Sequence, residues 1–127
     1  MLKDKMTLVI NSCDKFSDLW DEHVRILNEN WSDREVETLL VTDRPTDRKL
    51  ERVRIFSAGE GKEYPQRMAA VLPEIRTEYV LITLDDYFPI NKIYNDRLER
   101  LIGIMDAEGI DYLRLFSDPN SHKRFKD

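Results

Sequence analysis

Residues Glu78–Asp86 read EYVLITLDD and carry the strongest strand signal in the chain. Within it, aromatic, aliphatic and β-branched residues follow one another without a charge, as in a buried strand of a parallel sheet. Asp85 and Asp86 end the run abruptly. We predict a central strand over residues 78–84, with two carboxylates at its carboxyl end.

The rest of the chain alternates short apolar runs with longer amphipathic stretches. Further strands are predicted at MTLVINS (6–12), ETLLVT (37–42), VRIFS (53–57) and IDYLRLF (110–116). Apolar residues at helical spacing predict helices over 16–31, 62–76 and 91–108. Pro73 is expected to distort the end of the second helix, and Gly109 to stop the third. Strands separated by helices indicate an α/β, Rossmann-like fold, with a mostly parallel sheet flanked by helices on both faces.

Length and composition limit the class of protein. The 127 residues suit one domain, which we place at 1–116, followed by a polar tail at 117–127. The net charge is −5, and the basic residues are dispersed, which argues against nucleic-acid binding. A single cysteine and the lack of a signal peptide predict a cytoplasmic protein. No apolar run reaches the roughly 20 residues that span a bilayer, so no transmembrane segment is expected.

Polar and acidic residues follow the strands where the carboxyl ends of parallel strands would meet. Ligands of open parallel sheets bind at this edge. The residues expected there follow the first, second and fourth strands: Asn11, Ser12, Cys13, Asp43, Asp85 and Asp86. Carboxylates at one edge suit Mg²⁺ or Mn²⁺ bridging to a phosphorylated ligand. An adjacent aspartate pair is also typical of a solvated turn, and the sequence leaves both interpretations open.

The sequence lacks the motifs of several common sites. It contains no GxGxxG or GxxxxGK[ST], and no CxxC, HExxH or GxSxG. Cys13 has no evident base nearby in the sequence and is assigned to packing. His23 falls near the apolar stripe of the first helix and is expected to be packed or half-buried, while Trp20 and Trp31 are assigned to the core.

Four segments, taken in order, resemble a known family. They are NSCDKFSDLW (11–20), VTDRPTD (41–47), PQRMAAVL (65–72) and VLITLDDYF (80–88). Together they resemble the nucleotide-sugar-binding half of GT-A glycosyltransferases, of the type that builds bacterial surface polysaccharide or lipopolysaccharide. The resemblance covers about residues 6–116. Each motif is short, so their order and spacing carry the resemblance.

The resemblance implies roles for residues at the strand ends. It places the nucleotide against Asn11, Ser12, Cys13, Asp43, Arg67 and Asp85. It also implies that Asp86, helped by Asp85, holds a divalent cation, Mn²⁺ or Mg²⁺, on the diphosphate of a nucleoside diphosphate sugar. The chain departs from the family where Met68 replaces an asparagine, and where Tyr87 occupies the place of a second carboxylate in a D-x-D motif.

The resemblance further implies transfer of the sugar to a glycan or lipid-linked acceptor. Such an enzyme would work in the cytoplasm, with peripheral association at the inner membrane face as an option. No catalytic residue is assigned, and Asp118 and His122 are the remaining candidates for a base. The chain matches only the donor half of such an enzyme, so an incomplete enzyme is one interpretation.

A non-catalytic protein-interaction domain on the same fold is the alternative function. Under either function, an open sheet edge and uncovered apolar surface favour a homodimer. A receiver-type phosphoacceptor domain is disfavoured, because residues 11–13 do not supply the acidic pair that such a domain needs after its first strand.

Overall fold

The computed structural model describes residues 1–115 of the chain. Its strands are β1 (Met6–Asn11), β2 (Thr38–Thr42), β3 (Arg54–Ser57) and β4 (Tyr79–Leu84). Its α-helices are α1 (Trp20–Asn30), α2 (Tyr64–Val71) and α3 (Asn95–Glu108). Short 3₁₀ helices occur at η1 (Leu2–Asp4), η2 (Asp14–Leu19) and η3 (Leu72–Glu74). No helix in this part of the chain is long and apolar enough to cross a membrane.

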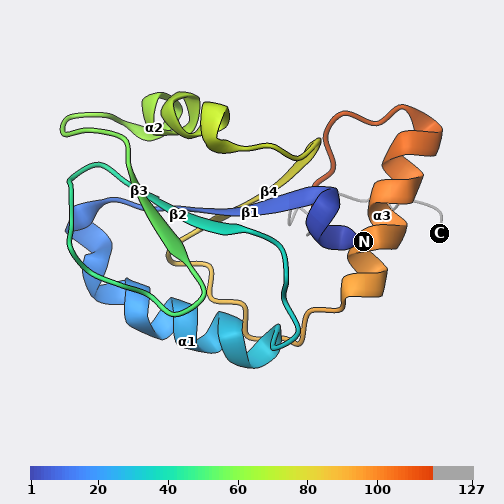
Figure 1. Cartoon of the computed structure of the whole chain (residues 1–127), viewed down its shortest axis with the longest axis horizontal. Helices are drawn as coiled ribbons and strands as arrows, with labels where there is room; N and C mark the ends of the chain where they lie inside the picture. The colour runs from blue at the N-terminus through green and yellow to red at the C-terminus, as the bar shows by residue number, and fades with distance from the viewer. Residues whose placement is uncertain (116–127) are drawn as a thin grey trace, which may run out of the picture.

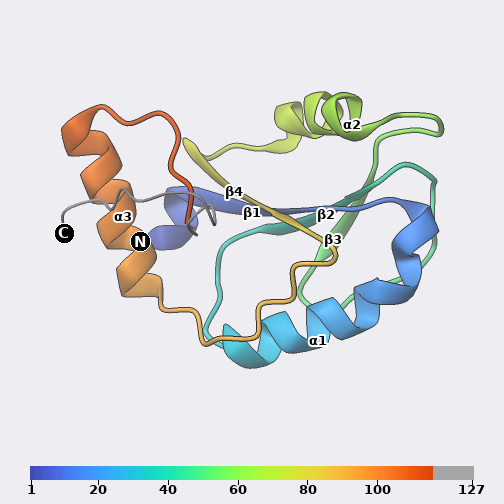
Figure 2. The ribbon, with the colours of Figure 1, turned by 180° about the vertical axis from the view of Figure 1, so that it is seen from behind.

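The strands form one parallel sheet in the order β3-β2-β1-β4 (Figure 1). Leu8 of β1 lies opposite Thr38 of β2 on one side and Leu81 of β4 on the other. α1 covers one face of the sheet and α2 the opposite face, as both ribbon views show (Figures 1 and 2). This arrangement confirms the predicted α/β, Rossmann-like fold.

The core lies on both faces of β1 and β2, whose residues are all buried. Successive side chains of a strand point to opposite faces, so β1 directs Leu8 and Ile10 toward α1 and Val9 toward α2. The helices complete the core with Trp20, Leu27 and Trp31 on the α1 side and Val71 on the α2 side. The two tryptophans therefore have the packing role that their spacing predicts.

The parallel strands β2 and β3 are joined without a helix. Residues 43–53 cross on the α1 side of the sheet, where Leu50 and Val53 pack against the core and form an isolated antiparallel bridge. The Arg48 guanidinium holds this loop in place by donating a hydrogen bond to the Ser17 carbonyl at 2.8 Å. The loop thus supplies the apolar cover that a helix usually gives to a parallel sheet.

One cation is buried beside this loop. Arg34 is 5% exposed, and its guanidinium donates to Thr38 Oγ1 at 2.8 Å and to Asn28 Oδ1 at 2.9 Å. A third hydrogen bond reaches the Arg52 carbonyl at 3.1 Å, whereas Nη1 has no partner among the described residues. Burial, together with the charge of Arg52, lowers the pKa of Arg34 to about 10. Arg34 therefore joins the end of α1, the start of β2 and the loop before β3.

The end of α2 is distorted, as Pro73 predicts. The helix proper ends at Val71, and the chain continues from Leu72 to Glu74 as a 3₁₀ helix. Proline has no N–H to donate and clashes with the preceding turn of an α-helix, so the tighter turn replaces it here.

α3 lies at the amino end of the sheet, away from the predicted site (Figures 1 and 2). It begins at Asn95, later than predicted, because the preceding residues run along the end of α1 with Ile93 N–H bonded to the Asn30 carbonyl. The spacing of apolar residues over 91–108 predicts Tyr94 on the inward face, but Tyr94 is the N-cap residue of α3, in an extended conformation and 40% exposed, so this prediction is wrong. Gly109 ends α3 in the left-handed conformation, with φ of 66°, as predicted.

The predicted strand over residues 110–116 is absent from its described part. Residues 110–115 form no ladder, and Tyr112 and Leu115 are exposed. Apolar alternation alone does not make a strand, because the backbone also needs a neighbouring strand to pair with. Residue 116 and the predicted tail at 117–127 lie outside the described residues.

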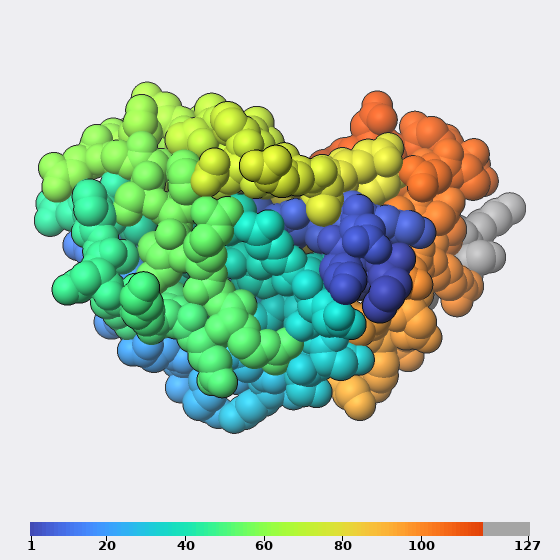
Figure 3. All heavy atoms as spheres, in the orientation of Figure 1, coloured from blue at the N-terminus to red at the C-terminus, as the bar shows by residue number. Residues whose placement is uncertain are grey.

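β4 is an edge strand, so the prediction of a central strand over 78–84 is wrong. Its only described strand neighbour is β1, and all six of its residues are partly or largely exposed, Ile82 to 47%. In the space-filling view the surface is notched between the segment that leads into β4 and the end of α3 (Figure 3). The apolar sequence of β4 predicts a strand but does not predict its position in the sheet.

Candidate functional site

The carboxyl ends of β1 and β4 meet in a buried chain of polar contacts. Ser12 follows β1 and is 3% exposed, and Asp85 follows β4 and is 8% exposed. The Ser12 hydroxyl donates to Asp85 Oδ2 at 2.5 Å, and it accepts a hydrogen bond from Trp20 Nε1 at 2.8 Å. Asp85 N–H also binds the Asn11 carbonyl at 3.2 Å. The structure therefore brings together three of the predicted residues, Asn11, Ser12 and Asp85.

Trp20 and His23 brace this site from the buried face of α1. They lie three residues apart and thus on the same side of the helix. His23 is 1% exposed, and its Nδ1 lies 3.0 Å from the Asp85 carbonyl oxygen. Because a carbonyl oxygen only accepts hydrogen bonds, Nδ1 carries the proton. The prediction that His23 is packed is confirmed, but neither its bond to Asp85 nor that of Trp20 to Ser12 was predicted.

The surroundings of His23 favour its neutral form. Burial lowers the pKa of His23 below its ordinary value. The hydrogen bond to the Asp85 carbonyl and the negative charges of Asp85 and Asp86 oppose this effect without cancelling it. The Phe88 ring, with its centroid 5.7 Å from that of the imidazole, supplies part of the apolar contact.

Asp43 connects the loops that follow β1 and β2 through a hydrogen bond. Its Oδ1 accepts the Asp14 backbone N–H at 2.8 Å and lies 3.3 Å from the Thr42 hydroxyl. Burial would raise the pKa of Asp43, but this hydrogen bond, the backbone N–H groups of Asp43 and Arg44, and the Thr42 hydroxyl together hold it below its ordinary value. Asp43 lies at the predicted edge, with one oxygen already engaged by the protein.

Arg67 reaches the same edge from α2. Its Nε donates to Asn11 Oδ1 at 3.4 Å, and its Nη1 donates to the Lys62 carbonyl at 2.7 Å. Within residues 1–115 no carboxylate lies within 4.0 Å of its guanidinium. The predicted proximity of Arg67 to the end of β1 is thus present. Cys13, the remaining predicted residue, is half-buried directly after Ser12.

The aspartate pair does not form a divalent-cation site with the other described residues. Asp85 is buried and bonded to Ser12, while Asp86 is exposed. Among residues 1–115, no group of three or more histidine, cysteine, aspartate or glutamate side chains could hold a metal ion. Mg²⁺ and Mn²⁺ favour several oxygen ligands in a defined geometry. The protein offers at most Asp85 and Asp86, so a cation here would also need oxygen ligands from the bound phosphates, and we derive no step through it.

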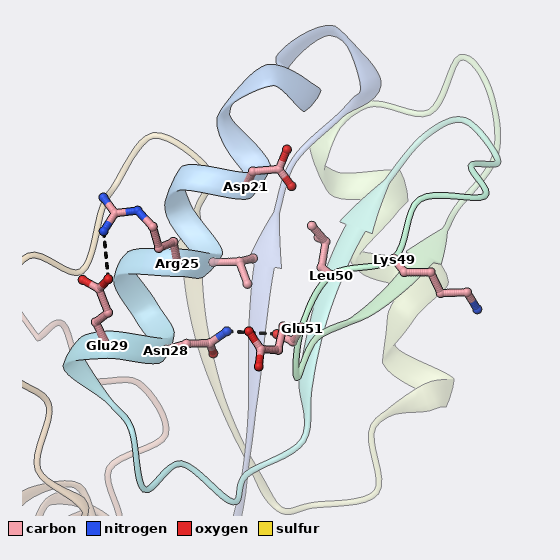
Figure 4. A pocket seen from close by; sticks show the side chains of 8 residues that line it. Asp21, Arg25, Asn28, Glu29, Lys49, Leu50 and Glu51 are labelled. Atoms are coloured by element: carbon pink, nitrogen blue, oxygen red, sulfur yellow. Dashed lines mark hydrogen bonds and ion pairs between the residues drawn. The ribbon is translucent and has the colours of Figure 1, made fainter.

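A groove of about 350 Å³ lies elsewhere, between α1 and the loop before β3 (Figure 4). Its walls carry both charges, and several of these groups already bind one another. Arg25 donates to Glu29 at 2.9 Å, and Asn28 donates to the Glu51 carbonyl at 3.1 Å. Arg25, Glu29 and Asn28 are thus engaged with protein groups, and we do not assign a site to this groove.

Comparisons with protein families, curated proteins and solved structures found no match to this chain. The functional interpretation therefore depends on the strand-end residues and their geometry.

Proposed function

We propose that the carboxyl edge of the sheet binds a nucleoside diphosphate sugar. One observation carries the proposal, namely the meeting of Asn11, Ser12 and Asp85 at the ends of β1 and β4, with Arg67 bonded to Asn11. A carboxylate accepts hydrogen bonds from ribose hydroxyls, and a guanidinium binds phosphate oxygens. Both groups that a nucleotide requires are thus present at the edge where parallel sheets bind their ligands.

The reaction that fits such a ligand is glycosyl transfer. An acceptor hydroxyl on a glycan or a lipid-linked sugar attacks the anomeric carbon, its proton passes to a base, and the nucleoside diphosphate leaves with the bonding electrons. The described residues assign no base, and the predicted candidates Asp118 and His122 lie outside them. A lipid-linked acceptor would place the chain in the cytoplasm, at the inner face of a membrane.

Calorimetric titration with UDP and with GDP tests the binding step. We expect saturable heat with one of them, and at least a tenfold weaker affinity for Asp85→Asn, because the amide cannot accept at both oxygens. Asp33→Asn, an exposed change outside the site, serves as the control and should bind like the parent. Circular dichroism confirms that each variant is folded. If neither nucleotide produces heat or raises the melting temperature, the proposal is wrong.

A second candidate function has its own observation, the exposed apolar edge of β4. Residues 79–84 carry no charge and no proline, which are the usual features that protect an edge strand from pairing. We propose that a second copy of the chain pairs with this edge. Light scattering should then show a dimer, and Ile82→Lys should convert it to a monomer without unfolding it. A monomeric parent at high concentration would contradict this candidate.

A further inference from the structure

We infer that Arg67 and Lys62, and not a divalent cation, supply the positive charge that holds the phosphates of the ligand. This inference rests on the proposed nucleotide binding and specifies how the diphosphate is recognised. It starts from the lack of a cation site built by the described residues alone, and from the position of two cations on the α2 side of the same edge.

The Arg67 guanidinium is oriented by the protein but not neutralised. Two of its five N–H donors are used, one by Asn11 Oδ1 and one by the Lys62 carbonyl. These two bonds fix the plane of the guanidinium beside the last residue of β1. The donors on Nη2 have no hydrogen-bond partner within residues 1–115. A fixed guanidinium with free donors matches two phosphate oxygens at once.

Lys62 extends the positive charge toward the ends of β2 and β3. Its side chain lies over Gly59, where an added Cβ would come within 3.3 Å of Lys62 Cε. The Gly59 N–H binds the Asp43 carbonyl at 2.9 Å, so Lys62 lies beside the loop that follows β2. No ion pair of Lys62 is present in the described part of the chain. Lys62 and Arg67 thus flank the α2 side of the edge.

Other arginines near the edge are already committed to carboxylates. Arg44 lies 4.0 Å from Asp14 and 3.9 Å from Glu60. Arg48 pairs with Asp21 at 2.9 Å. A phosphate that approached either arginine would have to compete with these carboxylates, whereas at Arg67 it would not.

Asp85 lies on the side of β1 away from these cations, whereas Asp43 lies beside Lys62 at the end of β2. Asp85 follows β4 and is bonded to Ser12 and, through its carbonyl, to His23 on the α1 side. Like charges repel, so the phosphates are expected above Asn11 toward α2, and the ribose toward Asp85. The phosphates and the ribose would then be bound on opposite sides of β1, with no metal ion between them.

The test compares nucleosides with their diphosphates. Uridine, UDP, guanosine and GDP are titrated into the parent chain with excess EDTA and, separately, with saturating Mn²⁺. We expect the diphosphate to bind at least tenfold more tightly than its nucleoside, by about the same factor in both conditions. Arg67→Gln should remove most of that preference, a loss of roughly 10- to 100-fold for charge-assisted hydrogen bonds. Arg67→Lys should keep part of it.

Lys62→Gln should reduce the diphosphate preference by a smaller factor, and it carries the test if Arg67→Gln does not fold. Arg97→Gln removes an exposed cation from α3, at the opposite end of the sheet, and should change nothing. The inference is overturned if Mn²⁺ strengthens UDP or GDP binding tenfold or more and Asp86→Asn abolishes that gain. It also fails if Arg67→Gln and Lys62→Gln both keep the full preference. If the parent binds no nucleoside or nucleotide at all, the proposed function itself fails, and this inference with it.

Discussion

Ser12→Ala should destabilise the whole domain, because the Ser12 hydroxyl joins two buried groups. The change leaves the indole N–H of Trp20 and the Oδ2 atom of Asp85 without their partner. A buried group that loses its hydrogen bond costs about 1–3 kcal/mol, and a charged one more. Two such groups give an expected loss of about 3 kcal/mol, or roughly 10 °C in melting temperature for a domain of this size.

Urea unfolding followed by tryptophan fluorescence measures this loss, since both Trp20 and Trp31 are buried. The urea midpoint should fall while the m-value stays constant. Ser57→Ala is the matched control: its hydroxyl donates to the Arg44 carbonyl at 2.8 Å on the surface, and its removal should cost under about 0.5 kcal/mol.

A double-mutant cycle of Ser12→Ala and Asp85→Asn identifies the contact responsible. Residues in direct contact show interaction energies of about 0.5–3 kcal/mol. The double variant should therefore lose less stability than the sum of the losses of the two single variants. The reasoning is refuted if Ser12→Ala costs no more than Ser57→Ala, or if the two site changes are fully additive.

Three further predictions follow from other polar groups. Asp43→Asn should cost more stability at pH 7 than near pH 3, as urea unfolding at several pH values would measure. A carboxyl whose pKa is lowered in the folded state stabilises that state above its unfolded pKa, and this contribution is lost as the pH falls. The lowered pKa of His23 means that the unfolded chain takes up its proton first, so stability should fall as pH drops below about 6.5, and His23→Gln should reduce that slope. Arg34→Lys should cost about 2 kcal/mol in urea unfolding, because lysine cannot reach all three acceptors of the buried guanidinium. Arg25→Lys, which alters two exposed ion pairs, is the control and should cost clearly less than Arg34→Lys in the same measurement.

The sequence was sufficient for the fold class because its strongest signals are local. The apolar runs of β1 and β2 are buried on both faces, and the period of the α1 stripe matches the helix that covers them. Pro73 and Gly109 act within one turn of their own position, so their effects were predictable. What failed is the placing of strands relative to one another.

Edge and central strands have similar sequences when both are apolar. β4 looks more buried than β1 in its sequence, yet it lies at the edge of the sheet. Residues 110–115 alternate as a strand would but pair with no strand of residues 1–115. Strand pairing depends on which backbones meet in space, and the hydrophobic pattern alone does not predict the order of strands in the sheet.

The candidate site was likewise only partly predictable from the sequence. Asn11, Ser12 and Asp85 were predictable because parallel strands bring their carboxyl ends together. The hydrogen bonds from Trp20 and His23 were not, because burial of a helix face does not say which polar atom each side chain will reach. The engagement of Asp85 by Ser12 likewise depends on contacts across the sheet.

The contact between Ser12 and Asp85 spans 73 positions of the chain, and this has a consequence for the order of folding. Loop-closure entropy grows with the logarithm of loop length, and closing a loop of this length costs about 4 kcal/mol before the contact contributes any stabilisation. β1 and β2 pair across 30 positions, Leu8 with Thr38, and by the same scaling this closure costs about 1 kcal/mol less. The binding edge should therefore assemble last, after most of the chain has been synthesised. A partly folded chain would hold the central strands but no ligand, so ligand-dependent protection in pulsed hydrogen exchange would mark the final step.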